Sequence, residues 1–258
     1  MSTARLLILG SSAGRASAHR AASCYLVDLG EFGVMIDCGD GATRNFLAAG
    51  YQPEWVSHIL ISHTHADHVC GLPYFIQQRY LARTENPLTI CCPREAIAPL
   101  KQLLIFDHLY PESMPFETVF VPIQPRHAWS IGGAVFAAYP TSHLAPQRAF
   151  AAEHGYPDPG ECFAFRMQLA GKSLLYSADL GSLDDLNVIT HAIDWLLIET
   201  SHVDLEMLWP WAEERGIKRI ILTHLSDDFD MSQLALPAKY TSAEIIVAKD
   251  GMALDLDK

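Results

Sequence analysis

The sequence has few charged residues and no run of basic ones. Asp, Glu, Lys and Arg make up 19% of its 258 residues, and the formal net charge is −12. Phosphate backbones are bound by clustered Lys and Arg, so this composition argues against a surface built to coat nucleic acid. The low charge and a hydrophobic content of 50% also argue against long disordered tracts and predict a sizeable core.

Long hydrophobic runs and paired cysteine motifs are missing too. No apolar run reaches the roughly 20 residues that cross a bilayer, so we expect no membrane partner. The N-terminal run Leu6–Leu9 is too short for the core of a signal peptide, which predicts a cytoplasmic protein. The six cysteines show no C-x-x-C spacing and are expected to be reduced thiols.

What the sequence does contain is a dense cluster of histidines. His63, His65, Asp67 and His68 follow the apolar run Ile59–Ile61 with the spacing H-x-H-x-D-H. At the end of a strand, side chains two residues apart point the same way, so His63 and His65 can reach one point. Asp67 and His68 can reach a second point nearby. Imidazoles with a carboxylate suit zinc or another divalent first-row metal. A His-rich surface turn is the alternative, which this spacing after a buried strand disfavours.

Four further apolar runs of strand length end in a possible ligand or acid. These residues are His143, Asp179, Glu199 and His224. Functional sites of layered α/β folds collect where strand ends meet, so we expect these side chains near the histidine cluster. His127 competes with His143, but it follows a Pro-rich segment, whereas His143 directly follows a strand.

The chain shows strands in its first half and alternating strands and helices in its second. No linker divides it, so residues 1–258 are predicted to form a single domain. The pattern predicts two sheets packed face to face with helices outside, an αββα sandwich. The local expectations include a helix over residues 69–82, an irregular connection over 144–160, a helix over 232–240 and pairing of 244–248 with 251–256.

Between a strand and a helix, H-x-H-x-D-H resembles the signature of the metallo-β-lactamase superfamily. The resemblance implies two divalent metal ions, zinc above all, with manganese, iron or cobalt as alternatives. Two such ions polarise a phosphoryl or acyl oxygen and supply hydroxide at neutral pH. The implied ligands are His63, His65 and His143 for the first ion, Asp67, His68 and His224 for the second, and Asp179 as a bridge.

The N-terminal third is similar to ribonuclease Z. The segment Asp37–Gly41, D-C-G-D-G, matches that family's D-C-G-E-G with Asp for Glu, and Gly71–Pro73 matches the residues after its histidines. The glycine-rich loop after the first strand keeps the family's spacing of Gly, Arg20 and Ser23. The resemblance covers most of the chain and also implies a homodimer.

Some residues depart from that pattern and disfavour transfer RNA as the substrate. Only 35 residues separate His143 from Asp179, where ribonuclease Z usually carries a long arm that grips tRNA. Asp227 and Asp228 replace basic or aromatic residues that touch RNA, and carboxylates repel phosphate. In addition, Ala178 stands where the superfamily usually has glycine.

The function that this resemblance implies is a dinuclear metal-dependent hydrolase. Armless relatives include phosphodiesterases for cyclic nucleotides, among them the anti-Pycsar enzymes, so we expect a phosphodiesterase that uses a metal-bridging hydroxide on a small phosphodiester or nucleotide. Asp67 would be essential to the reaction, and His202 or Glu199 would pass a proton to the leaving oxygen. Arg20 or Ser226 would contact phosphate.

Three alternatives remain open from the sequence. The first is a tRNA 3′ endonuclease of the ribonuclease Z type. The second is a lactone or thioester hydrolase, against which the ribonuclease Z-like N-terminus argues. The third is a non-catalytic protein that binds a metal or a nucleotide, against which the intact ligand pattern argues.

Overall fold

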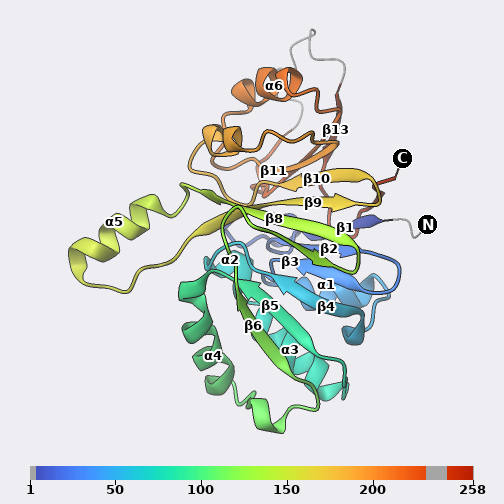
Figure 1. The fold of residues 1–258 in the computed structure, drawn as a ribbon, viewed down its shortest axis with the longest axis vertical. Coiled ribbons are helices and arrows are strands. Elements are labelled where there is room, and N and C mark those ends of the chain that lie inside the picture. The colour runs from blue at the N-terminus through green and yellow to red at the C-terminus, as the bar shows by residue number, and fades with distance from the viewer. Residues whose placement is uncertain (1–3, 231–242, 258) are drawn as a thin grey trace.

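The structure, a computed structural model, describes residues 4–230 and 243–257 and shows two stacked β-sheets with helices on their outer faces (Figure 1). In the first sheet the strand order is β14-β1-β2-β3-β4-β5-β6, and in the second it is β13-β12-β11-β10-β9-β8-β7. The predicted αββα sandwich is therefore confirmed. In the described residues no helix is long and apolar enough to cross a membrane.

The strands of the first sheet are β1 (Arg5–Gly10), β2 (Cys24–Asp28), β3 (Gly33–Ile36), β4 (Val56–Leu60), β5 (Leu88–Cys92), β6 (Thr118–Pro122) and β14 (Ala253–Asp255). Those of the second are β7 (Ala128–Ile131), β8 (Ala134–Thr141), β9 (Cys162–Leu169), β10 (Lys172–Tyr176), β11 (Trp195–Glu199), β12 (Arg219–Thr223) and β13 (Glu244–Val247). The α-helices are α1 (Ala42–Ala48), α2 (Ala66–Val69), α3 (Leu72–Leu81), α4 (Ile97–Phe106), α5 (Ala145–His154) and α6 (Leu205–Glu214). The 3₁₀ helices are η1 (Pro53–Trp55), η2 (Arg94–Ala96), η3 (Pro111–Ser113) and η4 (Leu183–Val188).

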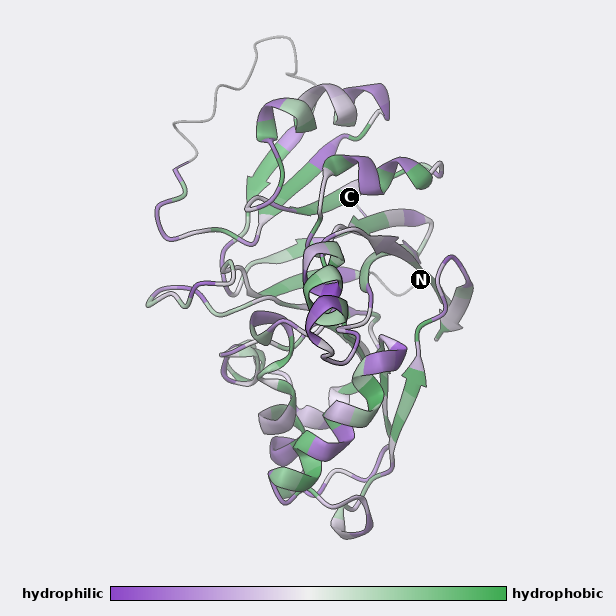
Figure 2. Cartoon of the chain, turned by 90° about the vertical axis from the view of Figure 1, so that its left-hand side faces the viewer, coloured by the Kyte–Doolittle hydropathy of each residue, from purple (hydrophilic) through white to green (hydrophobic). Residues whose placement is uncertain are grey.

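Strand side chains alternate between apolar layers on the two faces of each sheet, which explains the uninterrupted hydrophobic runs in the sequence. The strands are accordingly coloured mainly as hydrophobic in Figure 2. Leu6 and Ile8 of β1 face the core between the sheets, whereas Leu7 and Leu9 face the layer that includes α1 and α3. The outer face of the second sheet is covered in the same way by η4 and α6. A strand buried on both faces has no polar side to expose, so its sequence reads as continuously apolar.

The expected helix over 69–82 is divided in two. α2 ends at Val69 and α3 begins at Leu72, with Pro73 in its first turn, where a missing N–H costs nothing. Glycine is sterically required at position 71, between the two helices, because a Cβ there would lie 2.2 Å from the carbonyl oxygen of Gly39. The backbone of α2 is thereby held against the Asp37–Gly41 segment.

The expectation of an irregular connection over 144–160 was wrong in part. Residues Ala145–His154 form α5, which projects from the body of the molecule (Figure 1). Pro146 lies in the first turn, and Gly155 ends the helix with a left-handed φ of 70°. Proline and glycine therefore mark the two ends of a helix here instead of an irregular segment.

The expected pairing of 244–248 with 251–256 was also wrong. β13 pairs in parallel with β12, whereas β14 pairs antiparallel with β1 in the other sheet. The connection crosses between the sheets, and Asp250 within it accepts hydrogen bonds from Ser11 and from the N–H of Ala21 near the first sheet. The helix expected over 232–240 falls outside the described residues.

Candidate metal centre

The structure brings the seven predicted ligands together from five separate places in the chain. His63 and His65 lie in the loop after β4, Asp67 and His68 on α2, and the remaining three directly after β8, β10 and β12. His63, His65, His143 and Asp179 form one group and Asp67, His68 and His224 another, each with ligand atoms within 4.8 Å of one another. His127 belongs to neither group among the described residues and lines an apolar pocket with Trp129.

Asp179 lies between the two groups and turns one oxygen towards each. Its Oδ2 is 3.5 Å from His143 Nε2 and 3.8 Å from His63 Nε2. Its Oδ1 is 3.3 Å from His68 Nε2 and 3.6 Å from His224 Nε2. On the second side, Asp67 Oδ2 lies 3.1 Å from His224 Nε2 and 3.3 Å from His68 Nε2. This is the arrangement expected of a carboxylate shared by two cations.

Several atoms of this centre are buried without a hydrogen-bond partner. They are Nε2 of His63, Nε2 of His68 and Oδ1 of Asp179. An unpaired buried polar atom costs free energy, so such atoms are rare and call for a partner. The three point into the same space between imidazoles and carboxylates, and the donor set of nitrogen and oxygen fits divalent first-row metals. The residues present therefore fit the metal-binding expectation.

Burial and neighbouring carboxylates set the charges of the imidazoles. Burial lowers the pKa values of His63, His65 and His143, which keeps these rings neutral and their lone pairs available. Burial also opposes a charge on His68, but the carboxylates of Asp179 and Asp37 outweigh it and raise its pKa well above the usual value. A metal cation in this position would replace the proton as the partner of these carboxylates.

Asp37 holds His68 in place, and the sequence did not single it out for this role. Its Oδ2 accepts hydrogen bonds from His68 Nδ1 at 2.8 Å, Tyr176 Oη at 2.8 Å and Ser62 Oγ at 2.9 Å. Its Oδ1 accepts the Ser62 N–H at 2.7 Å. The bond to Nδ1 leaves Nε2 of His68 facing Asp179, as metal-binding histidines require. The D-C-G-D-G motif was the available signal, but it does not reveal the partners.

Three residues at strand ends adopt left-handed backbone conformations around the centre. The φ angles are 56° at Asp37, 48° at Ala178 and 54° at His224. Non-glycine residues pay about 1–2 kcal/mol for this conformation. It explains why the superfamily usually has glycine at the position of Ala178: the chain turns sharply there to aim Asp179 at both groups of ligands.

Glu199 and His202 form a pair at the edge of the centre. Glu199 is buried, and its Oε2 accepts the N–H groups of Ser201 and His202 at 2.6 and 2.8 Å. Its Oε1 lies 3.2 Å from His202 Nδ1, and this hydrogen bond raises the pKa of His202. The exposed ring of His202 lies 4.8 Å from that of His143, measured between centroids. Nε2 of His202 is thus the atom that remains free of Glu199.

The two expected phosphate contacts are engaged elsewhere in the protein. Arg20 donates from Nη1 to Ser11 Oγ and to a backbone carbonyl after β13, both at 2.9 Å, and thereby fastens the glycine-rich loop. Ser226 is hydrogen-bonded to Asp228, which lowers the pKa of that exposed carboxyl. Neither side chain belongs to the donor groups of the centre among the described residues.

A site of two ligand groups at the strand ends of an αββα sandwich defines the metallo-β-lactamase class. Solved structures share the fold: YhfI of Bacillus subtilis, of metallo-β-lactamase fold, has a TM-score of 0.77 and 22% identity over 98% of this chain and 99% of that one. A diphosphatase of the PhnP family has a TM-score of 0.69 and 18% identity over 97% of each chain. Ribonuclease Z of Methanosarcina acetivorans is 23% identical over 98% of both chains.

The family model described as anti-Pycsar protein Apyc1 matches residues 4–244, and the chain belongs to this family. It is a metal-dependent hydrolase of the metallo-β-lactamase superfamily, in the ribonuclease Z-like branch. The predicted superfamily and branch are confirmed.

Proposed function

We propose that this protein is a dinuclear phosphodiesterase that hydrolyses a small phosphodiester or a cyclic nucleotide. The observation that carries the proposal is the position of Asp179, whose two oxygens face two separate groups of imidazoles. A single metal ion needs only one such group, and a shared carboxylate is how proteins hold two ions a few ångströms apart.

In this proposal the seven side chains divide as the resemblance implies. One ion would be held by His63, His65 and His143 and the other by Asp67, His68 and His224, with one oxygen of Asp179 available to each. When bound, two zinc ions, or manganese, iron or cobalt, would polarise the phosphate oxygens and lower the pKa of water. The protein side chains orient the substrate around this centre and handle the proton of the leaving group.

His202 is the proton donor in this proposal, and Glu199 is its positioning residue. Glu199 is 1% exposed and its carboxylate is occupied by backbone N–H groups, so it is too enclosed to reach a substrate. Its bond to Nδ1 of His202 fixes the tautomer and favours the charged ring, which leaves the Nε2 proton for the leaving oxygen.

The size of the substrate is inferred from what surrounds the centre. The segment between His143 and Asp179 holds the ten-residue helix α5 and the sheet strands β9 and β10. Only α5 and its return lie outside the sheets, which offers little surface for a folded RNA. Asp227 and Asp228 follow the last ligand and disfavour the further phosphates of a long chain. Ribonuclease Z relatives covering the whole chain keep tRNA 3′ cleavage as the second candidate function.

We extend the proposal to a homodimer. Large apolar side chains of α3 and α4 that line one shallow pocket are exposed, including Tyr74 at 60%, Ile105 at 41% and Phe106 at 78%. A large patch of exposed apolar side chains is typical of a protein–protein interface and rare on surface that stays in contact with water. Light scattering should give the mass of two chains for the wild type and of one chain for Phe106→Glu. A monomeric wild type would contradict this part of the proposal.

Metal analysis combined with a substrate panel tests the function. The panel contains bis(p-nitrophenyl) phosphate, cyclic nucleotides, a precursor tRNA, a lactone and a thioester. We expect about two metal ions per chain and turnover of the small phosphodiesters. Asp67→Ala should abolish turnover, whereas Asp107→Ala, an exposed aspartate outside the centre, should leave it unchanged. Cleavage of tRNA alone, or of the esters alone, would overturn the proposal.

A further inference from the structure

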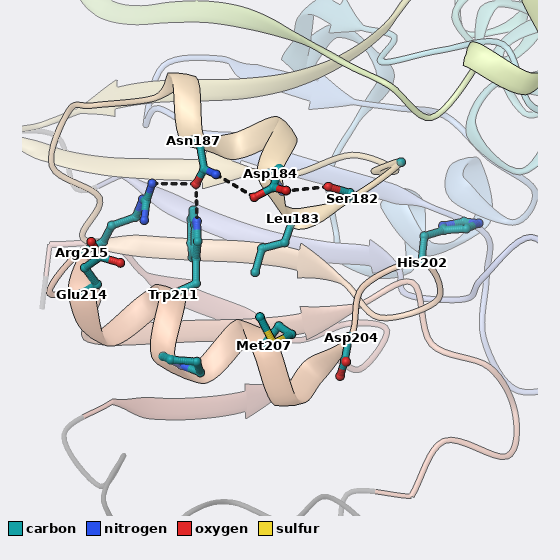
Figure 3. Close-up of a pocket in the computed structure, with 12 residues that line it drawn as sticks. Ser182, Leu183, Asp184, Asn187, His202, Asp204, Met207, Trp211, Glu214 and Arg215 are labelled. Atoms are coloured by element: carbon teal, nitrogen blue, oxygen red, sulfur yellow. Dashed lines mark hydrogen bonds between the residues drawn. The ribbon is translucent and has the colours of Figure 1, made fainter.

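A groove of about 750 Å³ lies between η4 and α6 on the outer face of the second sheet (Figure 3). Asn187, Trp211 and Arg215 lie at one end, and His202 lies at the other with its ring directed away from them. The groove therefore begins at the residue that faces the metal centre. A molecule whose phosphate lies in the centre would enter the groove beside His202.

The floor of the groove is held rigid by hydrogen bonds between η4 and α6. Oδ1 of Asn187 accepts from Trp211 Nε1 and from Arg215 Nη2, both at 2.9 Å. Nδ2 of Asn187 donates to Asp184 Oδ1 at 2.8 Å. The guanidinium of Arg215 also stacks 4.2 Å above the ring of Trp211. A floor fixed in this way is preorganised for a ligand and loses little entropy on binding.

The charge of the groove selects against anions. Asp184, Asp204 and Glu214 line it with three carboxylates, and Arg215 supplies one guanidinium. Carboxylates accept hydrogen bonds from hydroxyl and amino groups but repel phosphate. Met207, which is 60% exposed, adds a flexible apolar surface on which a ring can pack.

We propose that this groove receives the leaving group and selects an alcohol without further phosphates, such as a nucleoside. The inference rests on the proposed phosphodiesterase function and on His202 as the proton donor. Water supplies the new oxygen on phosphorus and gives up one proton. The bond to the leaving oxygen breaks with its electron pair on that oxygen, which takes the Nε2 proton of His202, and the proton released from water restores His202. From an acyclic phosphodiester the products are a phosphomonoester and a free alcohol, which occupies the groove; a cyclic nucleotide gives a single product, because its leaving hydroxyl stays attached.

Two neighbouring glutamates of α6 provide a matched test. Glu213 and Glu214 are both exposed at the C-terminal end of the helix, but only Glu214 lines the groove. Lysine is tolerated at both positions, since it favours helices and complements the negative helix end. Glu213→Lys and Glu214→Lys therefore change the net charge equally, and only the second changes the charge of the groove.

The substrates are dithymidine monophosphate and its two forms with one terminal phosphate, at the 5′ or the 3′ end. Product analysis shows which thymidine leaves. In the wild type, we expect a terminal phosphate on the leaving thymidine to lower kcat/KM about tenfold, and one on the other thymidine to have little effect. Glu214→Lys should remove most of this penalty, and Glu213→Lys should retain it.

Binding of the free products supplies a readout besides turnover. In calorimetric titrations with chelator present, thymidine should bind the wild type and thymidine 3′,5′-bisphosphate should bind at least about tenfold more weakly. Glu214→Lys should reduce the difference in affinity between thymidine and thymidine 3′,5′-bisphosphate. Equal effects of the two lysine variants, or no penalty for the leaving-side phosphate, would overturn the groove assignment while the phosphodiesterase function stands. Absence of turnover of every phosphodiester would overturn both.

Discussion

Asp37→Asn is the substitution that tests the architecture of the metal centre without touching a ligand. The carboxylate is fully buried and accepts four hydrogen bonds, three of them on Oδ2. An asparagine has the same shape but must place its amide nitrogen against either the Ser62 N–H or the donors on the other side. In one orientation the amide N–H of the asparagine faces the backbone N–H of Ser62 at 2.7 Å, so two donors oppose each other. In the other orientation the amide nitrogen meets Nδ1 of His68. That atom can accept the hydrogen bond only if the ring proton moves to Nε2, and a protonated Nε2 cannot bind metal.

The magnitude follows from these bonds. A buried donor left without an acceptor costs about 1–3 kcal/mol, and each bond to a charged acceptor that becomes neutral loses about 1 kcal/mol. We therefore expect Asp37→Asn to lower the free energy of unfolding by about 3–5 kcal/mol, a large part of the 5–15 kcal/mol typical of a domain. Metal affinity should fall by about 10- to 100-fold, as it does when the partner of a ligating histidine is lost.

Urea denaturation of the metal-free protein, followed by circular dichroism, measures the first effect, and zinc competition with a chromophoric chelator measures the second. Tyr176→Phe is the matched control because it removes one donor and leaves Asp37 charged with three others. It should cost only about 1 kcal/mol and change zinc affinity little. The reasoning fails if Asp37→Asn unfolds within 1 kcal/mol of the wild type (the spread of single hydrogen-bond effects) and binds zinc equally well.

Three further outcomes are expected. His143→Ala should lower the metal content measured by mass spectrometry, whereas His127→Ala should not, and the reverse result would exchange their roles. The Glu199 hydrogen bond raises the pKa of His202, and an acid works only below its pKa, so kcat should fall as pH rises through that value. Glu199→Gln should shift this fall to lower pH, and an unmoved pH–rate profile would remove the pair from proton transfer. Arg79→Met should lower the unfolding free energy by about 2–4 kcal/mol with metal content retained, because the buried guanidinium donates to three backbone carbonyls. A loss of metal in this variant would mean that the first sheet and the centre are coupled.

Local spacing allowed much of the centre to be predicted. His63 and His65 are two residues apart after a strand, and Asp67 and His68 are neighbours on a short helix, so covalent geometry alone limits where their side chains can point. The apolar runs before His143, Asp179 and His224 also located the strand ends, because strands buried on both faces are continuously hydrophobic.

Other features followed from packing and could not be read locally. Segment 144–160 has the proline and glycine of a loop, yet those residues delimit α5, since the same residue types mark both helix ends and turns. β13 and β14 are close enough in sequence to form a hairpin. Instead β13 pairs with the edge of the second sheet at β12, and β14 pairs with the edge of the first sheet at β1.

The sequence by itself determined the class of chemistry, because ligand type and spacing in H-x-H-x-D-H are local properties of the chain. Only the tertiary structure decided that Asp37 fixes His68, that Asp179 faces both ligand groups and that Glu199 lies behind His202. The contacts of Asp179 with His68 and of Asp37 with Tyr176 join the two sheets, and their geometry depends on how the layers pack, which no local pattern of residues encodes.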